Sequence, residues 1–480
     1  MHRNDSLRTM TATRWASPAG AALLLGLTLV AASLTAAAQP TIDLDYSHIH
    51  QRTLDNGLHV VVVEQPTVPI VTIELAARNG AFTEPPELNG LSHLYEHMFF
   101  KANASYPNQE AFMARQRELG MDWNGTTGSE RVNYFFTLPS ELTDEGVAFM
   151  AAAIRTPRFD QEELERERVV VLGEYDRNEA NPFYHLWEAT QKLLWYAHPS
   201  RKDSLGERDV ISTATVEQMR WMQQTYYVPN NILLVLSGDI TAERGFELAE
   251  QHLGDWPRGQ DPFRANPIPE HPPLRGDVTT VITQPVNISV VQMAWHGPDT
   301  RNDVEATYAA DVFSFILGQD GSRFQENLVQ SGVALSASIG YSTQKYVGPI
   351  YLTVVTQPGG EQRAINAVLE ELERFNAPDY FTDEQLATAI TLLAVDDLAG
   401  QQSSLNMAHT LSYWWCSASI DYYLNYIDNL RAVTRDDIRR YVETYIIGQP
   451  RVVALMAGPA TVTGGGWTDA SLLDAISPAP

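Results

Sequence analysis

The sequence predicts an α+β fold of two duplicated domains, each an antiparallel sheet packed with helices. The chain has 480 residues, more than the roughly 250–300 at which a single hydrophobic core stops growing. A helix-like stretch, a turn, an apolar strand and a glycine follow one another in residues 216–240 and again in 435–459. Each half also opens with a strand-like stretch, LHVVVVEQPTVPIVTIELAA in the first and VTTVITQPVNISVVQMAWHG in the second. Because the same order of elements recurs about 220 residues later, we expect a duplication.

A proline-rich segment, residues 255–277, separates the two halves. Proline has no backbone donor and is excluded from helix interiors and central strands, so we expect a semi-extended linker here. On this basis the N-terminal domain is predicted over 41–254 and the C-terminal domain over 278–465. The prolines of the linker are Pro257, Pro262, Pro267, Pro269, Pro272 and Pro273.

The first 38 residues have the pattern of a bacterial export signal. A head containing three arginines precedes an apolar run over 19–34, and the small residues Ala36, Ala37 and Ala38 then form a cleavage pattern. A membrane anchor is the alternative, but about 16 apolar residues fall short of the roughly 20 needed to cross a bilayer. We therefore expect residues 1–38 to be removed, which leaves a periplasmic or secreted protein without a membrane anchor.

Composition excludes several classes of protein. With 44% hydrophobic residues the chain can form packed cores, so it is not predicted to be disordered. The 59 acidic and 33 basic residues give a formal charge of −26, which disfavours binding to nucleic acid. The only cysteine is Cys416, so an internal disulfide and a thiolate-rich metal site are excluded. Any metal must be bound by histidines and carboxylates.

The first half contains the motif His-Leu-Tyr-Glu-His, residues 93–97. On a helix, His93 and His97 lie one turn and about 40° apart, so both imidazoles reach one ion. Glu96 projects at a neighbouring angle, where a carboxylate approaches a water molecule without itself being a ligand. This order of residues is the inverzincin signature of zinc enzymes. The alternative is an amphipathic helix whose histidines only form hydrogen bonds.

A catalytic zinc ion usually has three protein ligands, so a third residue is needed. The best candidate segment is 160–182, which is expected to be a helix that begins at Asp160. On its helical wheel Glu167 and Glu174 share a face with apolar side chains, whereas the other glutamates point away. A solvated, charged helix would explain the outward glutamates. It does not explain carboxylates on an apolar face, because a buried carboxylate needs a partner such as a metal ion.

The motif and a glutamate 77 positions after its second histidine resemble the pitrilysin/insulinase family of zinc metallopeptidases. The likeness is greatest to the half-sized branch that includes mitochondrial processing peptidase and its bacterial relatives, and it covers nearly all of the predicted mature chain. The segments that carry it are TLDNGLHVVVVE, GLSHLYEHMFFKA, NGTTGSERVNYFFTLP, ERERVVVLGE and YYVPNNILLVLSGDI.

The resemblance assigns a role to each candidate residue of the metal site. It implies one zinc ion per chain, bound by His93, His97 and Glu174, with Glu96 as the general base. Glu167 corresponds to a second family glutamate, which orients a ligand from outside the coordination shell.

Substrate binding is implied less completely. Asn124 corresponds to an active-site asparagine on an edge strand that holds the substrate backbone. Family members also have an arginine and a tyrosine in the second domain that bind the substrate near the scissile carbonyl. Arg323 corresponds to the arginine, but Leu335 occupies the position of the tyrosine. Tyr341 lies six residues further on and replaces it only if the backbone follows a different path.

The predicted function is an exported zinc-dependent endopeptidase that cleaves unfolded or short peptides. In this family peptides add a strand to an open sheet edge, so backbone hydrogen bonds provide affinity with little sequence selectivity. Because the tyrosine is missing, we expect the chain to be the zinc-bearing subunit of a two-chain enzyme whose homologous partner supplies the Arg/Tyr pair. The alternatives are a peptidase that is sufficient alone and an inactive structural or peptide-binding subunit.

Overall fold

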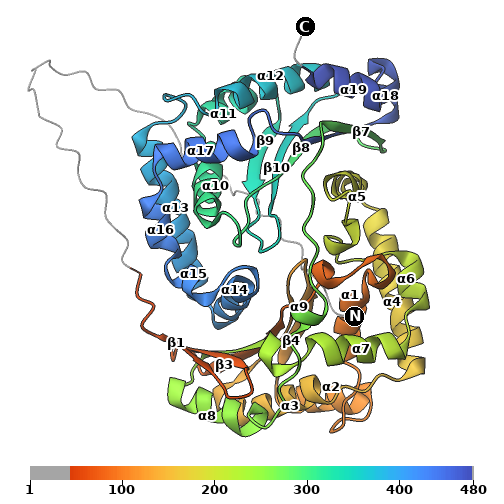
Figure 1. The fold of residues 1–480 in the computed structure, drawn as a ribbon, viewed down its shortest axis with the longest axis vertical. Helices are drawn as coiled ribbons and strands as arrows, with labels where there is room; N and C mark the ends of the chain where they lie inside the picture. Colours follow the sequence, from red (N-terminus) through yellow and green to blue (C-terminus); the bar gives the residue numbers. More distant parts are fainter. Residues whose placement is uncertain (1–43, 478–480) are drawn as a thin grey trace, which may run out of the picture. The chain divides into compact units, whose positions relative to one another are not determined.

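The computed structural model describes residues 44–477 and contains two separate sheets, each accompanied by helices (Figure 1). The predicted export signal lies outside the described residues. The first sheet has six strands in the order β1-β2-β6-β3-β5-β4. Their bounds are β1 Ile49–Thr53, β2 His59–Glu64, β3 Ile70–Ala77, β4 Asp122–Thr127, β5 Val132–Pro139 and β6 Ile232–Gly238.

The second sheet repeats the plan of the first. Its five strands lie in the order β7-β11-β8-β10-β9, so β11 is inserted between β7 and β8 as β6 is between β2 and β3. The bounds are β7 Val278–Thr283, β8 Ser289–His296, β9 Ser336–Tyr341, β10 Pro349–Thr356 and β11 Val452–Ala457. The shared topology confirms the predicted fold class of two duplicated α+β units.

The sheets differ from the expected pattern in one respect: each contains a parallel pair. β6 pairs in parallel with β2, and β11 pairs in parallel with β7, whereas all other pairs are antiparallel. The segment that connects each parallel pair contains three further strands and several helices, and it is long enough for the crossover that parallel neighbours require. β6 is buried along its whole length and so reads as a continuous apolar run.

Helices of the first half pack on one face of the first sheet and build its core. α8 packs on β2, α3 packs on β3 and β5, and α1 contacts α4, α7 and β4. The helices are α1 Leu91–Phe99, α2 Gln109–Glu118, α3 Thr143–Arg155, α4 Gln161–Glu179, α5 Pro182–Leu194, α6 Arg208–Thr213, α7 Val216–Tyr226 and α8 Ala242–Leu253. Short 3-10 turns are η1 Ala81–Thr83, η2 Pro86–Leu88, η3 Ser140–Leu142, η4 Pro199–Arg201 and η5 Pro229–Asn231.

The second half also contains many helices, which pack on its sheet and on one another. α10 packs against α13 and α17, and α19 packs on β7 and α12. The helices are α10 Val304–Leu317, α11 Arg323–Gln325, α12 Glu361–Arg374, α13 Asp383–Gly400, α14 Ser404–Ser417, α15 Ile420–Leu424, α16 Tyr426–Ala432, α17 Arg435–Tyr445, α18 Pro459–Gly465 and α19 Asp469–Ile476, with a π-turn η6 at Glu326–Gln330.

Each half contributes one helix to the sheet of the other half, as Figure 1 shows for α5 and α14. α14 packs on β3 and β6, where Leu411 and Trp415 join a buried cluster with Val61 and Val235. α5 packs on β11, where Leu186 contacts the buried face of the second sheet. This exchange covers a second face of the central strands, which explains why they are apolar on both sides.

The segment between the two sheets, 255–277, contains one short helix, α9 Pro262–Ala265, and is otherwise without regular structure. Asp261 caps this helix by accepting a hydrogen bond from the backbone of Phe263. Among the helices of residues 44–477, none is both long and apolar enough to span a bilayer.

Candidate metal site

The helix that carries the two histidines, α1, is held at its N-terminus by a buried carboxylate. Glu84 accepts hydrogen bonds from the backbone nitrogens of Gly90 at 2.7 Å and Ser92 at 2.6 Å. Burial raises the pKa of Glu84 to about 7, although these hydrogen bonds act in the opposite direction. Gly90 has a φ of 94°, a conformation that favours glycine. Leu94 and Met98 face the core, which turns His93 and His97 towards α4.

The three expected ligands converge between α1 and α4. His93 Nε2 lies 3.5 Å and His97 Nε2 lies 3.8 Å from the same oxygen, Oε2 of Glu174. One ligand atom from each residue lies within 4.8 Å of the others. Tetrahedral ligands about 2.1 Å from zinc are separated by about 3.4 Å, so these residues fit the ion. No other cluster of this kind occurs in the part of the chain that the structure describes.

The electrostatics of the two imidazoles differ. Burial, with the neighbouring His97, lowers the pKa of His93 to about 3, so this imidazole is neutral near pH 7, as a metal ligand must be. Burial also lowers the pKa of His97, but the hydrogen bond with Glu167 and the nearby carboxylates outweigh it, and the net pKa is raised. Within the described residues, the Nδ1 atom of His97 is thus held by a hydrogen bond with Glu167, whereas the buried Nδ1 atom of His93 has no hydrogen-bond partner.

Glu167 lies on α4, which begins where the sequence predicted: Asp160 caps the helix by accepting hydrogen bonds from Glu162 and Glu163. Glu167 is 6% exposed, and its carboxylate has two partners. Oε2 lies 3.1 Å from Nδ1 of His97, and Oε1 lies 2.5 Å from Nζ of Lys101. Burial raises the pKa of Glu167, but these two partners outweigh it and lower the pKa.

The expected general base, Glu96, lies against strand β4. Thr127 Oγ1 donates a 2.7 Å hydrogen bond to Glu96 Oε2. A Cβ at Gly125 would lie 2.9 Å from Cγ of Glu96, so only glycine lets the strand approach this closely. Burial raises the pKa of Glu96 to about 6, while Thr127 acts in the opposite direction. A carboxylate with a pKa near neutrality suits a general base.

Asn124 is exposed on β4, which pairs with β5 on one side and forms the edge of the first sheet. Its Oδ1 accepts a hydrogen bond from the backbone of Gly125. The structure therefore places Asn124 on the edge strand that packs against α1, the helix of the two histidines.

The three candidate substrate-binding positions of the second half are Arg323, Leu335 and Tyr341. Within residues 44–477, no hydrogen bond or ion pair joins any of them to His93, His97 or Glu174. Arg323 pairs with Asp379 at 2.8 Å. Leu335 is 50% exposed just before β9. The hydroxyl of Tyr341 donates to the carbonyl of Pro298 at 2.9 Å, so this phenol is already engaged within the second half.

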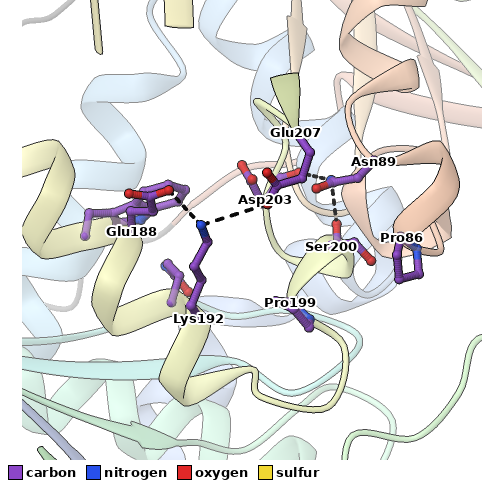
Figure 2. Close-up of a pocket in the computed structure, with 10 residues that line it drawn as sticks. Pro86, Asn89, Glu188, Lys192, Pro199, Ser200, Asp203 and Glu207 are labelled. Atoms are coloured by element: carbon purple, nitrogen blue, oxygen red, sulfur yellow. Dashed lines mark hydrogen bonds and ion pairs between the residues drawn. The ribbon is translucent and has the colours of Figure 1, made fainter. Parts of the chain in front are cut away.

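A separate pocket of about 100 Å³ lies beside the start of α1 (Figure 2). Asn89 donates to the carbonyls of Ser200 at 3.1 Å and Asp203 at 2.8 Å, which ties the start of α1 to the segment after α5. On α5, Lys192 pairs with Glu188 one turn before it at 2.8 Å, and its Nζ lies 3.9 Å from Glu207 of the facing segment. The pocket contains none of the three ligands.

Several site residues were not found by sequence reasoning. These residues are Lys101, Thr127 and Glu84. Lys101 lies four positions after His97, which is one helical turn, and this spacing was an available signal. Lys101 and Thr127 also lie inside the segments that resemble the family.

The fold and site define a class: a duplicated α+β protein with a His/His/Glu cluster able to hold a metal and a half-buried glutamate beside an edge strand. The chain belongs to the insulinase family, peptidase family M16. The family described as "Insulinase (Peptidase family M16)" matches residues 59–202, and that described as "Peptidase M16 inactive domain" matches 213–393.

Relatives in this family are named proteases. A protein of Rickettsia felis named "Uncharacterized zinc protease" is 23% identical over 73% of this chain and 83% of its own length. A protease from Helicobacter pylori has the same fold, with a TM-score of 0.75 and 21% identity over 85% of this chain and 99% of that one. The first half of the periplasmic protease PqqL from Escherichia coli has a TM-score of 0.74 and 18% identity, covering 89% and 96% of the two chains.

Proposed function

We propose that the chain is an exported, zinc-dependent endopeptidase. The observation that carries the proposal is the convergence of two imidazole nitrogens and a carboxylate oxygen, with Glu96 beside them on the same helix. Bound zinc supplies Lewis-acid chemistry, which makes water a nucleophile near neutral pH and polarises a peptide carbonyl. His93, His97 and Glu174 would hold one ion per chain.

Glu96 acts as the general base in this proposal. Its Oε2 accepts the hydrogen bond of Thr127, which leaves Oε1 to accept a proton from the attacking water. The same carboxyl then donates that proton to the leaving amine. Its raised pKa, about 6, lets both transfers occur near neutral pH.

The substrate binds as an added strand on the free edge of β4. This edge is next to Glu96, because Gly125 on β4 packs directly on its side chain. Asn124, exposed on the same strand, holds the substrate backbone. Recognition through backbone groups requires an extended chain, so unfolded proteins and short peptides are the proposed substrates.

A homologous partner subunit completes the enzyme in this proposal. Support comes from three positions in the second half: Arg323 pairs with Asp379, Tyr341 donates to Pro298, and the side chain of Leu335 has no hydrogen-bond donor. The partner would supply an Arg/Tyr pair near the scissile carbonyl, and this chain would be the zinc-bearing subunit. A periplasmic location is proposed from the sequence of residues 1–38 and from the relative that is named periplasmic.

The proposal is tested with purified mature chain, assayed for zinc content and for cleavage of an unstructured, internally quenched peptide. The assay is run with and without the paralogue encoded beside it, if one exists, and with wild type and Glu96→Gln. Cleavage that requires zinc and Glu96 supports the proposal. Zinc-loaded wild type that cleaves no peptide under any of these conditions would favour an inactive, peptide-binding subunit.

A further inference from the structure

We propose that Lys101 is a positioning residue of the metal site: its ammonium group holds Glu167, which in turn holds His97 for zinc. The proposal rests on the proposed zinc site. It assigns a role to a residue that belongs neither to the expected ligands nor to the expected base.

The geometry forms a chain of three side chains. Lys101 is 8% exposed, and its Nζ lies 2.5 Å from Oε1 of Glu167. The other oxygen, Oε2, lies 3.1 Å from Nδ1 of His97. The carboxylate therefore uses one oxygen for the ammonium and the other for the imidazole. Because Nδ1 is engaged as a donor, Nε2 of His97 keeps its lone pair for a metal.

The two elements involved are the two that carry the ligands. Lys101 lies just after the end of α1, where its backbone nitrogen bonds to the carbonyl of Met98. Glu167 lies on α4, two helical turns before Glu174. The Lys101–Glu167 ion pair thus joins α4 to the end of α1 next to the three proposed ligands.

The site has no equivalent support on its other histidine. His93 Nδ1 is buried and has no hydrogen-bond partner among residues 44–477. The Nε2 atom of His93 faces Oε2 of Glu174 at 3.5 Å, but within the described residues no hydrogen bond holds its Nδ1, so His97 is the imidazole whose Nδ1 a hydrogen bond orients. Without Lys101, one oxygen of Glu167 would be left buried and unpaired, and the side chain would turn away from His97 to find a partner.

The test measures zinc affinity, which does not depend on catalysis. Zinc is titrated in competition with a chromophoric chelator into wild type, Lys101→Met, Lys101→Gln and Lys101→Arg, and cobalt spectra report the geometry of the ligands. Loss of an outer partner typically costs 10–100-fold in metal affinity, so we expect the Met and Gln variants to weaken zinc binding by about that factor. Lys101→Arg should recover most of the affinity, because guanidinium also binds a carboxylate.

A double-variant cycle separates positioning from general stabilisation. If Lys101 acts through Glu167, zinc affinity in Lys101→Met/Glu167→Gln should be no weaker than in Glu167→Gln alone. Lys192→Met, which removes the exposed ion pair with Glu188, is the matched control and should leave zinc affinity unchanged. If Lys101→Met does not fold, the test is made with Lys101→Gln, whose polar side chain is better tolerated at this position.

The outcomes distinguish this inference from the proposed function. Zinc affinity of a folded Lys101→Gln or Lys101→Met variant within twofold of wild type would overturn the positioning role and leave the zinc site intact. Additive losses in the double variant would also overturn it. Wild type that binds no zinc would overturn both proposals.

Discussion

Thr127 on the edge strand donates a 2.7 Å hydrogen bond to Glu96 on the helix of the two histidines. The strand on which a peptide would lie and the group that would act as base are therefore in direct contact. Thr127 binds Oε2 of Glu96, and Gly125 leaves room for the rest of the side chain, including Oε1. A shift of β4 would move the proposed substrate strand and the base together.

Replacement of Thr127 by valine should reduce kcat without unfolding the protein. Valine keeps the shape of threonine but cannot donate to Glu96, and a hydrogen bond to a charged group is worth about 1.5–3 kcal/mol. We expect kcat to fall roughly tenfold or more, measured on the unstructured peptide. Thr126→Val is the control, because Thr126 lies on the opposite face of β4 and bonds to Asn133. Equal effects of the two variants would contradict the contact's role.

His97→Ala should strongly reduce bound zinc while the fold is largely kept. The variant removes one of three ligand atoms and leaves the α1 core face unchanged. Elemental analysis measures the bound zinc, and circular dichroism shows whether the fold is kept. His185→Ala is the control, since His185 contacts the Glu179 carbonyl rather than the metal ligands. Stoichiometric zinc in His97→Ala would disprove the ligand assignment.

Glu96→Gln should keep zinc and lose peptidase activity. The amide nearly preserves the shape of the carboxylate but cannot take a proton from water, and removal of a general base typically costs about 10²–10⁴ in rate. Zinc content and kcat are measured on the same sample. If kcat fell less than about tenfold, the base would have to be another group.

Asp311→Asn should change the dependence of stability on pH. Burial raises the pKa of Asp311 to about 7 from 3.8, although Tyr426 donates a 2.6 Å hydrogen bond to it. Because the folded pKa lies above the unfolded one, the contribution of Asp311 is favourable below about pH 4 and is lost as pH rises to about 7. We expect the wild-type Tm to fall more than the variant's over this range, by differential scanning fluorimetry. Glu384→Gln, at an exposed position of α13, is the control. Parallel Tm curves for wild type and Asp311→Asn would contradict the assignment.

The isolated chain should be weakly active, and a homologous subunit with an Arg/Tyr pair should activate it. Leu335 cannot donate to a developing oxyanion, and loss of one such donor costs about 10²–10³ in kcat. The candidate paralogue is titrated into the chain, and kcat is followed. Full activity of the single chain, unchanged by the paralogue, would refute the two-subunit hypothesis. A rise in activity in Leu335→Tyr alone would show that the second half serves the zinc of its own chain.

Local periodicity accounts for much of what the sequence predicted. His93, Glu96 and His97 lie on one helix, so a period of 3.6 residues places both imidazoles on one side. The same period puts Glu167 and Glu174 on one face of α4, and the structure brings both to the histidines. The duplication was also visible, because helix, turn and strand recur in the same order.

Tertiary structure alone decided the remaining features. The sequence determined which residues share a face, the class of fold and the residue types able to bind zinc. It did not determine that α5 and α14 exchange between sheets, that β6 enters in parallel beside β2, or that Lys101 and Thr127 hold Glu167 and Glu96. A helix or strand period relates residues a few positions apart. Lys101 and Glu167 are 66 positions apart, and only the packing of α1 on α4 brings that ammonium and carboxylate into contact.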